Sequence, residues 1–158
     1  TTSMKAVEAL EDMRLREGES LKLSIVECLD ALEAVRLRID GRKDDVVNEY
    51  AAKLRQRIQE LIINTDIDEA RFNTEVALMA DRADVTEEIV RLGTHISEFR
   101  KAAENSDAVG RKLDFMVQEM NREINTIGSK SQDSNITAAV IEGKSIIEKI
   151  REQVQNIE

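Results

Sequence analysis

The chain has 158 residues, no proline, no tryptophan and six glycines, with 23 basic and 32 acidic side chains and a formal net charge of −9. This charge excludes a broad, non-specific grip on nucleic acid, which needs an excess of lysine and arginine. The single cysteine, Cys28, excludes an internal disulfide and a thiolate metal cluster. A hydrophobic share of 41% with 35% charged residues suits helices that each bury one stripe.

Cysteine content and hydropathy also indicate the cellular compartment of the protein. A lone cysteine fits a reducing cytoplasm. No apolar run approaches the roughly 18 residues that span a bilayer, so we expect no membrane insertion. The segment 1–4 has neither the basic nor the apolar region of a secretion signal. It also lacks an initiator methionine at its first position, so we expect a fragment of a longer cytoplasmic protein.

The first helix is predicted over about 4–39, and the second over about 44–63. A heptad seam fills the second half of the first helix, with spacings of four and three through Leu21, Ile25, Cys28, Leu32, Val35 and Ile39. Gly41 is a typical stop signal after such a helix. Residues 1–63 are therefore predicted to form a long helical hairpin.

The third helix is predicted from about Asp66 and breaks near Asp84, where Asp84-Val85-Thr86-Glu87 has the pattern of a new helix start. A helix after 105–107 carries an apolar stripe through Val109, Leu113, Met116, Met120, Ile124 and Ile127. The small, polar segment 128–135 predicts a connection.

The last helix is predicted from about 135 to the end, with four-three spacing from Ile136 to Ile157. The fold class is thus all-α: an elongated helical bundle or antiparallel coiled-coil arms in one unit, 1–158. Because both seams are longer than a small bundle needs, we expect the chain to form an oligomer.

Two sets of polar residues accompany the apolar stripes in 64–158. Asp84, Glu88, Arg91 and His95 are spaced four, three and four, so they share one helix face. On the next helix, one flank of the core stripe carries Asp114, Gln118, Asn121 and Asn125, and the other carries Glu119, Glu123 and Thr126. Helices joined by a short loop pack antiparallel, so we expect polar stripes of the two helices to face each other.

This arrangement favours hard-cation and phosphate chemistry. Carboxylates one helical turn apart can share Mg²⁺ or Mn²⁺, which makes Asp84, Glu88, Glu119 and Glu123 candidate metal ligands. A bound ion would polarise a phosphodiester, with Arg91 or Arg122 stabilising charge and His95 as general acid or base. The candidate catalytic set is Glu119, Glu123, His95 and Arg122, and we expect the two glutamates to serve this chemistry and not stability. Candidate phosphate-binding residues are Arg91, Asn121, Asn125, Thr126, Lys130, Arg111 and Lys112.

Ordinary structural roles remain open for the same residues. Glutamate and arginine at helical spacing commonly form solvent ion pairs. A single histidine beside an apolar stripe is commonly a partly buried, hydrogen-bonded residue. Cys28 lies in the seam as a small buried residue and not as a nucleophile.

Three segments carry a resemblance to a known family. Residues 84–95, 109–131 and 150–158 resemble the C-terminal half of the YicC/YloC family of bacterial proteins, and Glu17, Gly18 and Leu21 fit the start of that region. The resemblance implies a cytoplasmic endoribonuclease linked to stress and small-RNA turnover. It also implies a divalent metal, a ring-like hexamer and an N-terminal domain that is missing here. The motif positions that it carries over are Asp84, Glu87, Glu88, Arg91, His95, Glu119, Asn121, Arg122, Glu123, Asn125, Thr126 and Lys130.

The sequence therefore predicts a metal-assisted endoribonuclease domain that binds RNA. The alternative is a non-catalytic helical scaffold that oligomerises and presents RNA to another RNA-degrading enzyme. The distance between the carboxylates separates the two hypotheses, because a shared ion needs oxygens within roughly 4–6 Å.

Overall fold

The computed structural model describes residues 2–62, 66–105 and 110–157, and these contain helices and no strand. The helices are α1 (Thr2–Leu61), α2 (Glu69–Arg82), α3 (Thr86–Glu104), α4 (Gly110–Lys130) and α5 (Ser134–Ile157). The predicted all-α fold is therefore confirmed. Within the same residues, no helix is both long and apolar enough to cross a membrane.

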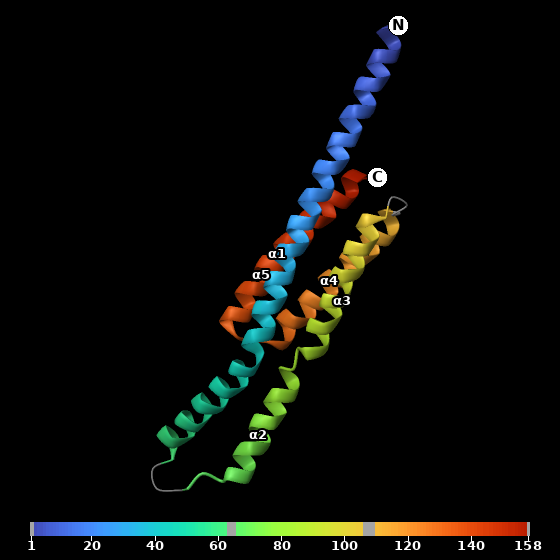
Figure 1. The fold of residues 1–158 in the computed structure, drawn as a ribbon. Coiled ribbons are helices and arrows are strands. Elements are labelled where there is room, and N and C mark those ends of the chain that lie inside the picture. The colour runs from blue at the N-terminus through green and yellow to red at the C-terminus, as the bar shows by residue number, and fades with distance from the viewer. Residues whose placement is uncertain (1, 63–65, 106–109, 158) are drawn as a thin grey trace.

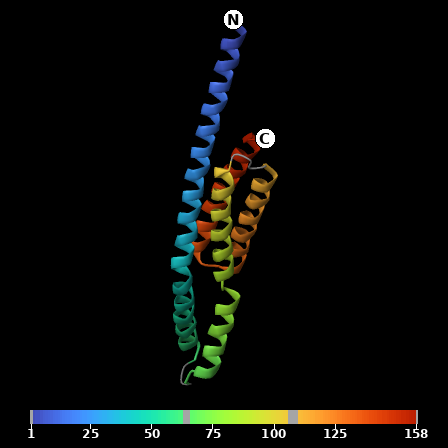
Figure 2. The same ribbon diagram turned by 45° about the vertical axis from the view of Figure 1, so that its right-hand side comes forward.

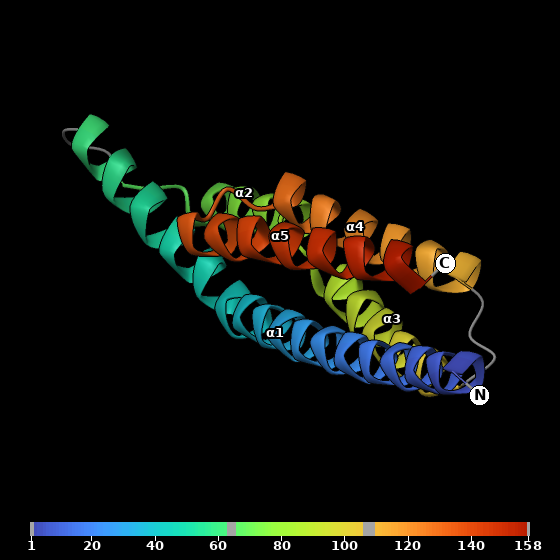
Figure 3. The same ribbon diagram turned by 90° about the horizontal axis from the view of Figure 1, so that it is seen from above.

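Four of the helices form one bundle. The middle of α1 packs against α3 and α5, and α4 packs against α3 and α5, so the helices close a ring in which neighbours run antiparallel (Figure 1). Viewed from above, α1 and α3 lie on one side of this ring and α4 and α5 on the other (Figure 3). Helix α2 lies outside the ring, beside the C-terminal part of α1 (Figure 2).

The core lies where the four apolar stripes meet. Helix α1 contributes the fully buried Ile25, Leu29, Leu32, Val35 and Ile39. The other helices contribute further large side chains that are fully buried, namely Leu92, Phe99, Leu113, Met120, Ile124, Ile127, Ile136 and Ile150. The predicted seam of α1 is thus covered largely by the chain's own helices, with Leu21 and Cys28 only partly buried at its edge.

Helix α1 passes through Gly41 without interruption, so the predicted stop and the predicted hairpin over 1–63 are wrong. A glycine in a helix interior costs about 1 kcal/mol relative to alanine, which a long helix tolerates when no proline follows. An ion pair between Lys43 and Asp40 at 2.8 Å also spans the position, and Arg42 directly after it pairs with Glu49 at 2.6 Å. The antiparallel neighbour of residues 44–61 is α2 and not the first half of α1.

The predicted break near Asp84 is present. Asp84 follows α2, and its Oδ1 accepts hydrogen bonds from the Thr86 backbone N–H at 3.0 Å and the Thr86 hydroxyl at 2.6 Å, just where α3 begins. The predicted connection 128–135 is shorter than expected, because α4 continues to Lys130. The predicted helix opening at 105–107 and Val109 fall mainly on 106–109, outside the described residues.

Gly128 lies inside α4, at a point where α4 and α5 approach closely. A Cβ atom at this position would lie 3.0 Å from Cγ1 of Val140. Gly143 on α5 is similar, because its Cβ would lie 3.0 Å from Cδ1 of Ile124 and 3.4 Å from Cγ1 of Val35. These glycines serve close packing of helices, and neither ends one.

Candidate metal and phosphate site

The candidate site forms where α3 and α4 run antiparallel. One face of α3 presents Glu88, Arg91 and His95, as their spacing predicted. The flank of α4 that meets this face carries Glu119 and Glu123, with Lys130 at the end of the helix. The contacts to the α3 face come from this flank of α4. Asn121 and Asn125, on the other flank, are exposed.

Arg91 joins the two helices. Its Nε donates to Oε1 of Glu123 at 3.0 Å, and its terminal nitrogens lie 3.2 Å from Glu87 and 3.4 Å from Glu88. The Glu123 side chain is only 6% exposed, whereas that of Arg91 is 47% exposed. The hydrogen bond to Glu123 raises the pKa of Arg91, so the guanidinium is a permanent positive charge at the edge of the site.

Lys130 forms a second link between the helices. Its Nζ lies 2.7 Å from Oε1 of Glu88 and 3.2 Å from the backbone oxygen of Asp84. Glu88 is 3% exposed, and its other oxygen, Oε2, has no hydrogen-bond partner among the described residues. Burial by itself raises the pKa of Glu88, but the hydrogen bond from Lys130 and the nearby Arg91 outweigh it and hold this pKa below 4.5.

His95, Glu119 and Glu123 converge. One ligand atom from each residue lies within 4.8 Å of the other two. His95 and Glu119 are half-buried, and Glu123 is buried. Among the described residues, this is the one such group of three. Of the four carboxylates whose separation the sequence hypothesis used, Glu119 and Glu123 thus fall inside the shared-ion range.

The predicted metal set is thus assembled only in part. Glu119 and Glu123 come together with His95, whereas Asp84 and Glu88 are outside this group. Asp84 is engaged with Thr86, and this hydrogen bond lowers the pKa of the Asp84 carboxyl. The carboxylate of Glu88 accepts from Lys130 and Arg91 instead.

The other predicted phosphate-binding residues of α4 do not join the group. Arg111, Lys112, Asn121 and Asn125 are exposed along the helix, and so is Arg122, which was predicted as a catalytic residue. The hydroxyl of Thr126 donates to the backbone oxygen of Arg122 at 3.0 Å, so it serves its own helix. These exposed side chains lie on different sides of α4, with Asn121 and Asn125 on the flank opposite Glu119 and Glu123.

The sequence patterns did not reveal a second polar cluster near the site. Arg42 on α1 lies 2.8 Å from Oδ1 of Asp133 and 2.6 Å from Glu49. Oδ2 of Asp133 also accepts from the backbone N–H of Ile136 at 3.0 Å, at the start of α5. The hydrogen bond from Arg42 lowers the pKa of Asp133. An aspartate three residues before the stripe that starts at Ile136 is a typical helix-start signal, but nothing local pointed to Arg42.

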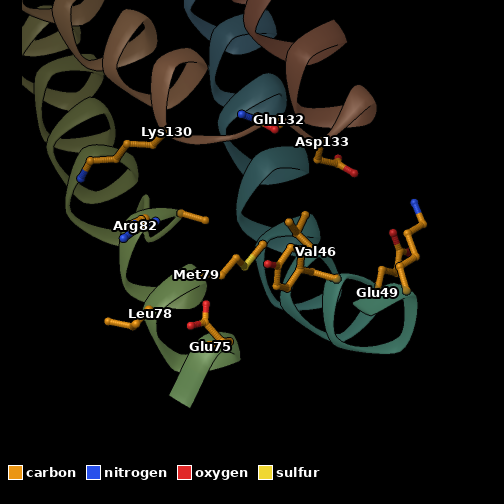
Figure 4. Close-up of a pocket in the computed structure, with 12 residues that line it drawn as sticks. Val46, Glu49, Glu75, Leu78, Met79, Arg82, Lys130, Gln132 and Asp133 are labelled. Atoms are coloured by element: carbon orange, nitrogen blue, oxygen red, sulfur yellow. The ribbon is translucent and has the colours of Figure 1, made fainter. Parts of the chain in front are cut away.

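A pocket of about 360 Å³ adjoins this cluster (Figure 4). It lies between the C-terminal part of α1, helix α2 and the connection from α4 to α5. Its lining residues are Val46, Glu49, Tyr50, Lys53, Glu75, Leu78, Met79, Arg82, Ala83, Lys130, Gln132 and Asp133. Lys130 therefore belongs both to this pocket and to the link with Glu88.

Comparison with known proteins identifies the family. Residues 39–158 match the family model described as endoribonuclease YicC-like, C-terminal. The chain belongs to this YicC-like family. The chain is also 49% identical over 150 residues to the probable endoribonuclease YicC of Clostridioides difficile strain 630, covering 94% of this chain and 51% of that protein. It is 42% identical over 146 residues to the probable endoribonuclease YicC of Haemophilus influenzae, covering 92% of this chain and 50% of that protein.

The resemblance predicted from the sequence motifs is therefore confirmed. This YicC-like chain spans about half the length of the curated relatives that it matches. The region that matches the family model begins at residue 39, within α1, and includes the convergent group, both inter-helix links and the pocket. The preceding part of α1 lies outside the matched region.

Proposed function

We propose that this chain is the helical part of a metal-assisted endoribonuclease that cleaves phosphodiester bonds of RNA. The convergence of His95, Glu119 and Glu123 carries the proposal, because it places three ligand atoms within 4.8 Å of one another. Relatives that cover nearly the whole chain are named probable endoribonucleases, which supports the reaction class.

The donor set fits a divalent cation and indicates which ones. Two carboxylates and an imidazole suit Mn²⁺ or Zn²⁺ better than Mg²⁺, which prefers oxygen ligands alone. A bound divalent ion would polarise a phosphoryl oxygen and lower the pKa of water. Of the two ions that the sequence hypothesis named, Mn²⁺ therefore fits this donor set better than Mg²⁺, and Zn²⁺ is a further candidate.

The remaining residues position the ligands and meet the RNA backbone. Arg91 holds the buried Glu123 in place, since its guanidinium is occupied by carboxylates on both helices. The exposed Arg111, Lys112 and Arg122 on α4 offer cations to phosphates. Asn121 and Asn125 offer hydrogen bonds to sugar and phosphate oxygens from the other flank of α4. Asp84 and Glu88 act in this account as helix-start and ion-pair residues.

The cellular location, the process and the partners in this proposal come from the family resemblance. In this proposal the protein cleaves small RNA in the bacterial cytoplasm during stress. It does so as a homo-hexamer and together with another RNA-degrading enzyme. One observation supports assembly, which the nuclease and the scaffold hypotheses share. The first helix presents Met4, Val7, Leu10 and Met13, each more than half exposed, in the segment 2–20, all of whose residues are exposed.

The test measures metal binding and RNA cleavage on the same variants. Titration of Mn²⁺ followed by electron paramagnetic resonance should give one site, weakened at least tenfold by His95→Gln or Glu119→Gln. Cleavage of a fluorescent, structured RNA by the intact protein should fall with the same variants and stop with EDTA. Glu104→Gln, an exposed carboxylate at the far end of α3, is the matched control.

Cleavage that persists in EDTA and in both variants would remove the metal from the mechanism. Absence of cleavage by the parent protein, with RNA binding intact, would instead favour the scaffold hypothesis.

A further inference from the structure

The guanidinium of Arg91 is divided between two buried carboxylates. Its Nε donates to Oε1 of Glu123 at 3.0 Å, whereas its Nη2 lies 3.4 Å from Oε1 of Glu88. These two nitrogens form the fork with which arginine commonly binds both oxygens of one carboxylate. Within the described part of the chain, the fork of Arg91 reaches only one oxygen of Glu123. The other oxygen, Oε2, therefore receives no hydrogen bond from this arginine.

Two other arginines of the chain use the undivided fork. Nε and Nη2 of Arg36 donate to the two oxygens of Glu33 at 2.9 and 2.5 Å. The same two nitrogens of Arg42 donate to the two oxygens of Asp133 at 3.2 and 2.8 Å. The divided fork at the candidate site thus departs from the arrangement that this chain adopts elsewhere.

Glu88 holds its share of the fork in an arrangement that stability alone does not favour. Lys130 and Arg91 both lie against the same oxygen of this buried carboxylate, Oε1. The other oxygen, Oε2, is buried and has no hydrogen-bond partner among the described residues. A buried acceptor that lacks a donor lowers the stability of the fold. The orientation of Glu88 therefore needs a further explanation.

We propose that Glu88 is a positioning residue that keeps Arg91 from closing on both oxygens of Glu123. The second oxygen of Glu123 then stays free to bind the divalent cation beside His95 and Glu119. Without Glu88, Nη2 pairs with that oxygen, and a guanidinium takes the position of the ion. This inference rests on the proposed function, and it gives Glu88 a role in metal affinity although Glu88 is not a ligand.

The experiment measures the affinity of the intact protein for Mn²⁺ by electron paramagnetic resonance. Glu88→Met keeps the approximate size of the side chain and removes the acceptor, so it should weaken binding by about tenfold or more. Glu88→Gln, which keeps an uncharged acceptor, should give an intermediate loss. Glu33→Met is the matched control, because it removes the acceptor of Arg36 at the same spacing of three residues and should bind Mn²⁺ like the parent.

A second background shows whether Glu88 acts through the arginine fork. Arg91→Lys keeps the positive charge but donates from a single nitrogen, so it cannot cover two oxygens of one carboxylate in the same way. In this background Glu88→Met should weaken Mn²⁺ binding by less than about threefold, which is the part due to the lost charge. Circular dichroism spectra equal to that of the parent show that the variants are folded.

A crystal structure of metal-free Glu88→Met tests the geometry without any ion. It should show Nε and Nη2 of Arg91 on the two oxygens of Glu123. A guanidinium that still reaches only Oε1 would overturn the inference, and so would Mn²⁺ binding as tight as that of the parent. The same loss of affinity with and without Arg91→Lys would show that Glu88 acts by charge or packing and would also overturn it.

The two proposals fail in different ways. Mn²⁺ binding that depends on His95 and Glu119 but not on Glu88 contradicts this inference alone. A parent protein that binds no Mn²⁺, together with a fork of Arg91 that closes on Glu123 in metal-free Glu88→Met, contradicts the metal and leaves Glu88 as the residue that divides the fork.

Discussion

Arg91 on α3 and Glu123 on α4 meet through a hydrogen bond of 3.0 Å between Nε and Oε1, in the middle of the candidate site. Glu123 is one of the few charged residues that the described part of the chain buries. The same carboxylate belongs to the convergent group with His95 and Glu119. Glu123 therefore stabilises the packing of two helices and is also placed to bind an ion.

This double role changes what we expect from substitution. Glu123→Gln should lower the Tm by about 2–5 °C, because the hydrogen bond from Arg91 loses the negative charge of its buried acceptor. Glu119→Gln should leave the Tm within about 1 °C, since Glu119 is half-buried and outside the Arg91 contacts. Thermal denaturation followed by circular dichroism measures both. Equal Tm values for the two variants would show that the Arg91–Glu123 contact does not stabilise the fold.

The link between Lys130 and Glu88 predicts a pH dependence. The pKa of Glu88 is held below its ordinary 4.5, so its contribution to stability is present above pH 4.5 and is lost as the pH falls through the lowered pKa. Lys130→Met removes the hydrogen bond that lowers the pKa of Glu88, so burial raises this pKa. Keeping the buried carboxylate ionised at neutral pH then costs free energy. The free energy of unfolding should drop by about 1–2 kcal/mol at pH 7 and by less at pH 4.

Urea denaturation at both pH values measures the effect, and Lys130→Met combined with Glu88→Gln is the control. In this double variant the pH-dependent part of the loss should disappear. A Lys130→Met penalty of the same size at pH 4 and pH 7 would contradict the assigned role of Glu88.

Gly143 should resist enlargement. A methyl group there would lie 3.0 Å from Cδ1 of Ile124, so Gly143→Ala should cost about 1 kcal/mol despite the better helix propensity of alanine. The same substitution in an Ile124→Val background, which removes Cδ1, should be neutral or stabilising. Gly41→Ala is the control, because nothing lies within 4 Å of its added Cβ, and it should stabilise by about 0.5–1 kcal/mol. Chemical denaturation distinguishes these signs.

Asp133 combines two functions that substitution can separate. Asp133→Asn keeps a side-chain oxygen for the N–H of Ile136 and removes the charge that Arg42 contacts. Asp133→Ala removes both, and should cost about 1 kcal/mol more than Asp133→Asn because the helix start is lost. The pKa of Asp133 is lowered, so the parent's advantage over Asp133→Asn should shrink as the pH falls below 3.8. An unchanged advantage at pH 3 would contradict the Arg42 contact.

Local periodicity was enough to predict the helix faces. The residues Leu113, Met116 and Met120 recur every three or four positions, and all are buried. The break near Asp84 was also predictable, because its signal lies within four residues. Gly41 misled the prediction, since one glycine lowers helix stability only slightly and the residues around it pair with one another.

The candidate site was predictable only within each helix. The spacing of Glu119 and Glu123, and of Arg91 and His95, showed which side chains share a face. It did not show which positions of α3 face which positions of α4, because that register depends on tertiary packing. For the same reason His95 joins the two glutamates where Asp84 and Glu88 were expected, and the partnership of Arg42 with Asp133 had no local signal.

The uneven packing of α1 divides one continuous helix into segments with different opening free energies. Amide protons around Leu29 and Leu32 exchange with solvent only when the bundle itself unfolds, since these side chains are fully buried. Residues 2–20 are exposed throughout, so their backbone hydrogen bonds open by fraying at far lower cost. Residues 44–61 lie between these extremes, because α2 covers them only in part. A single helix thus has its highest exchange protection in its middle, and the protection falls along the chain in both directions.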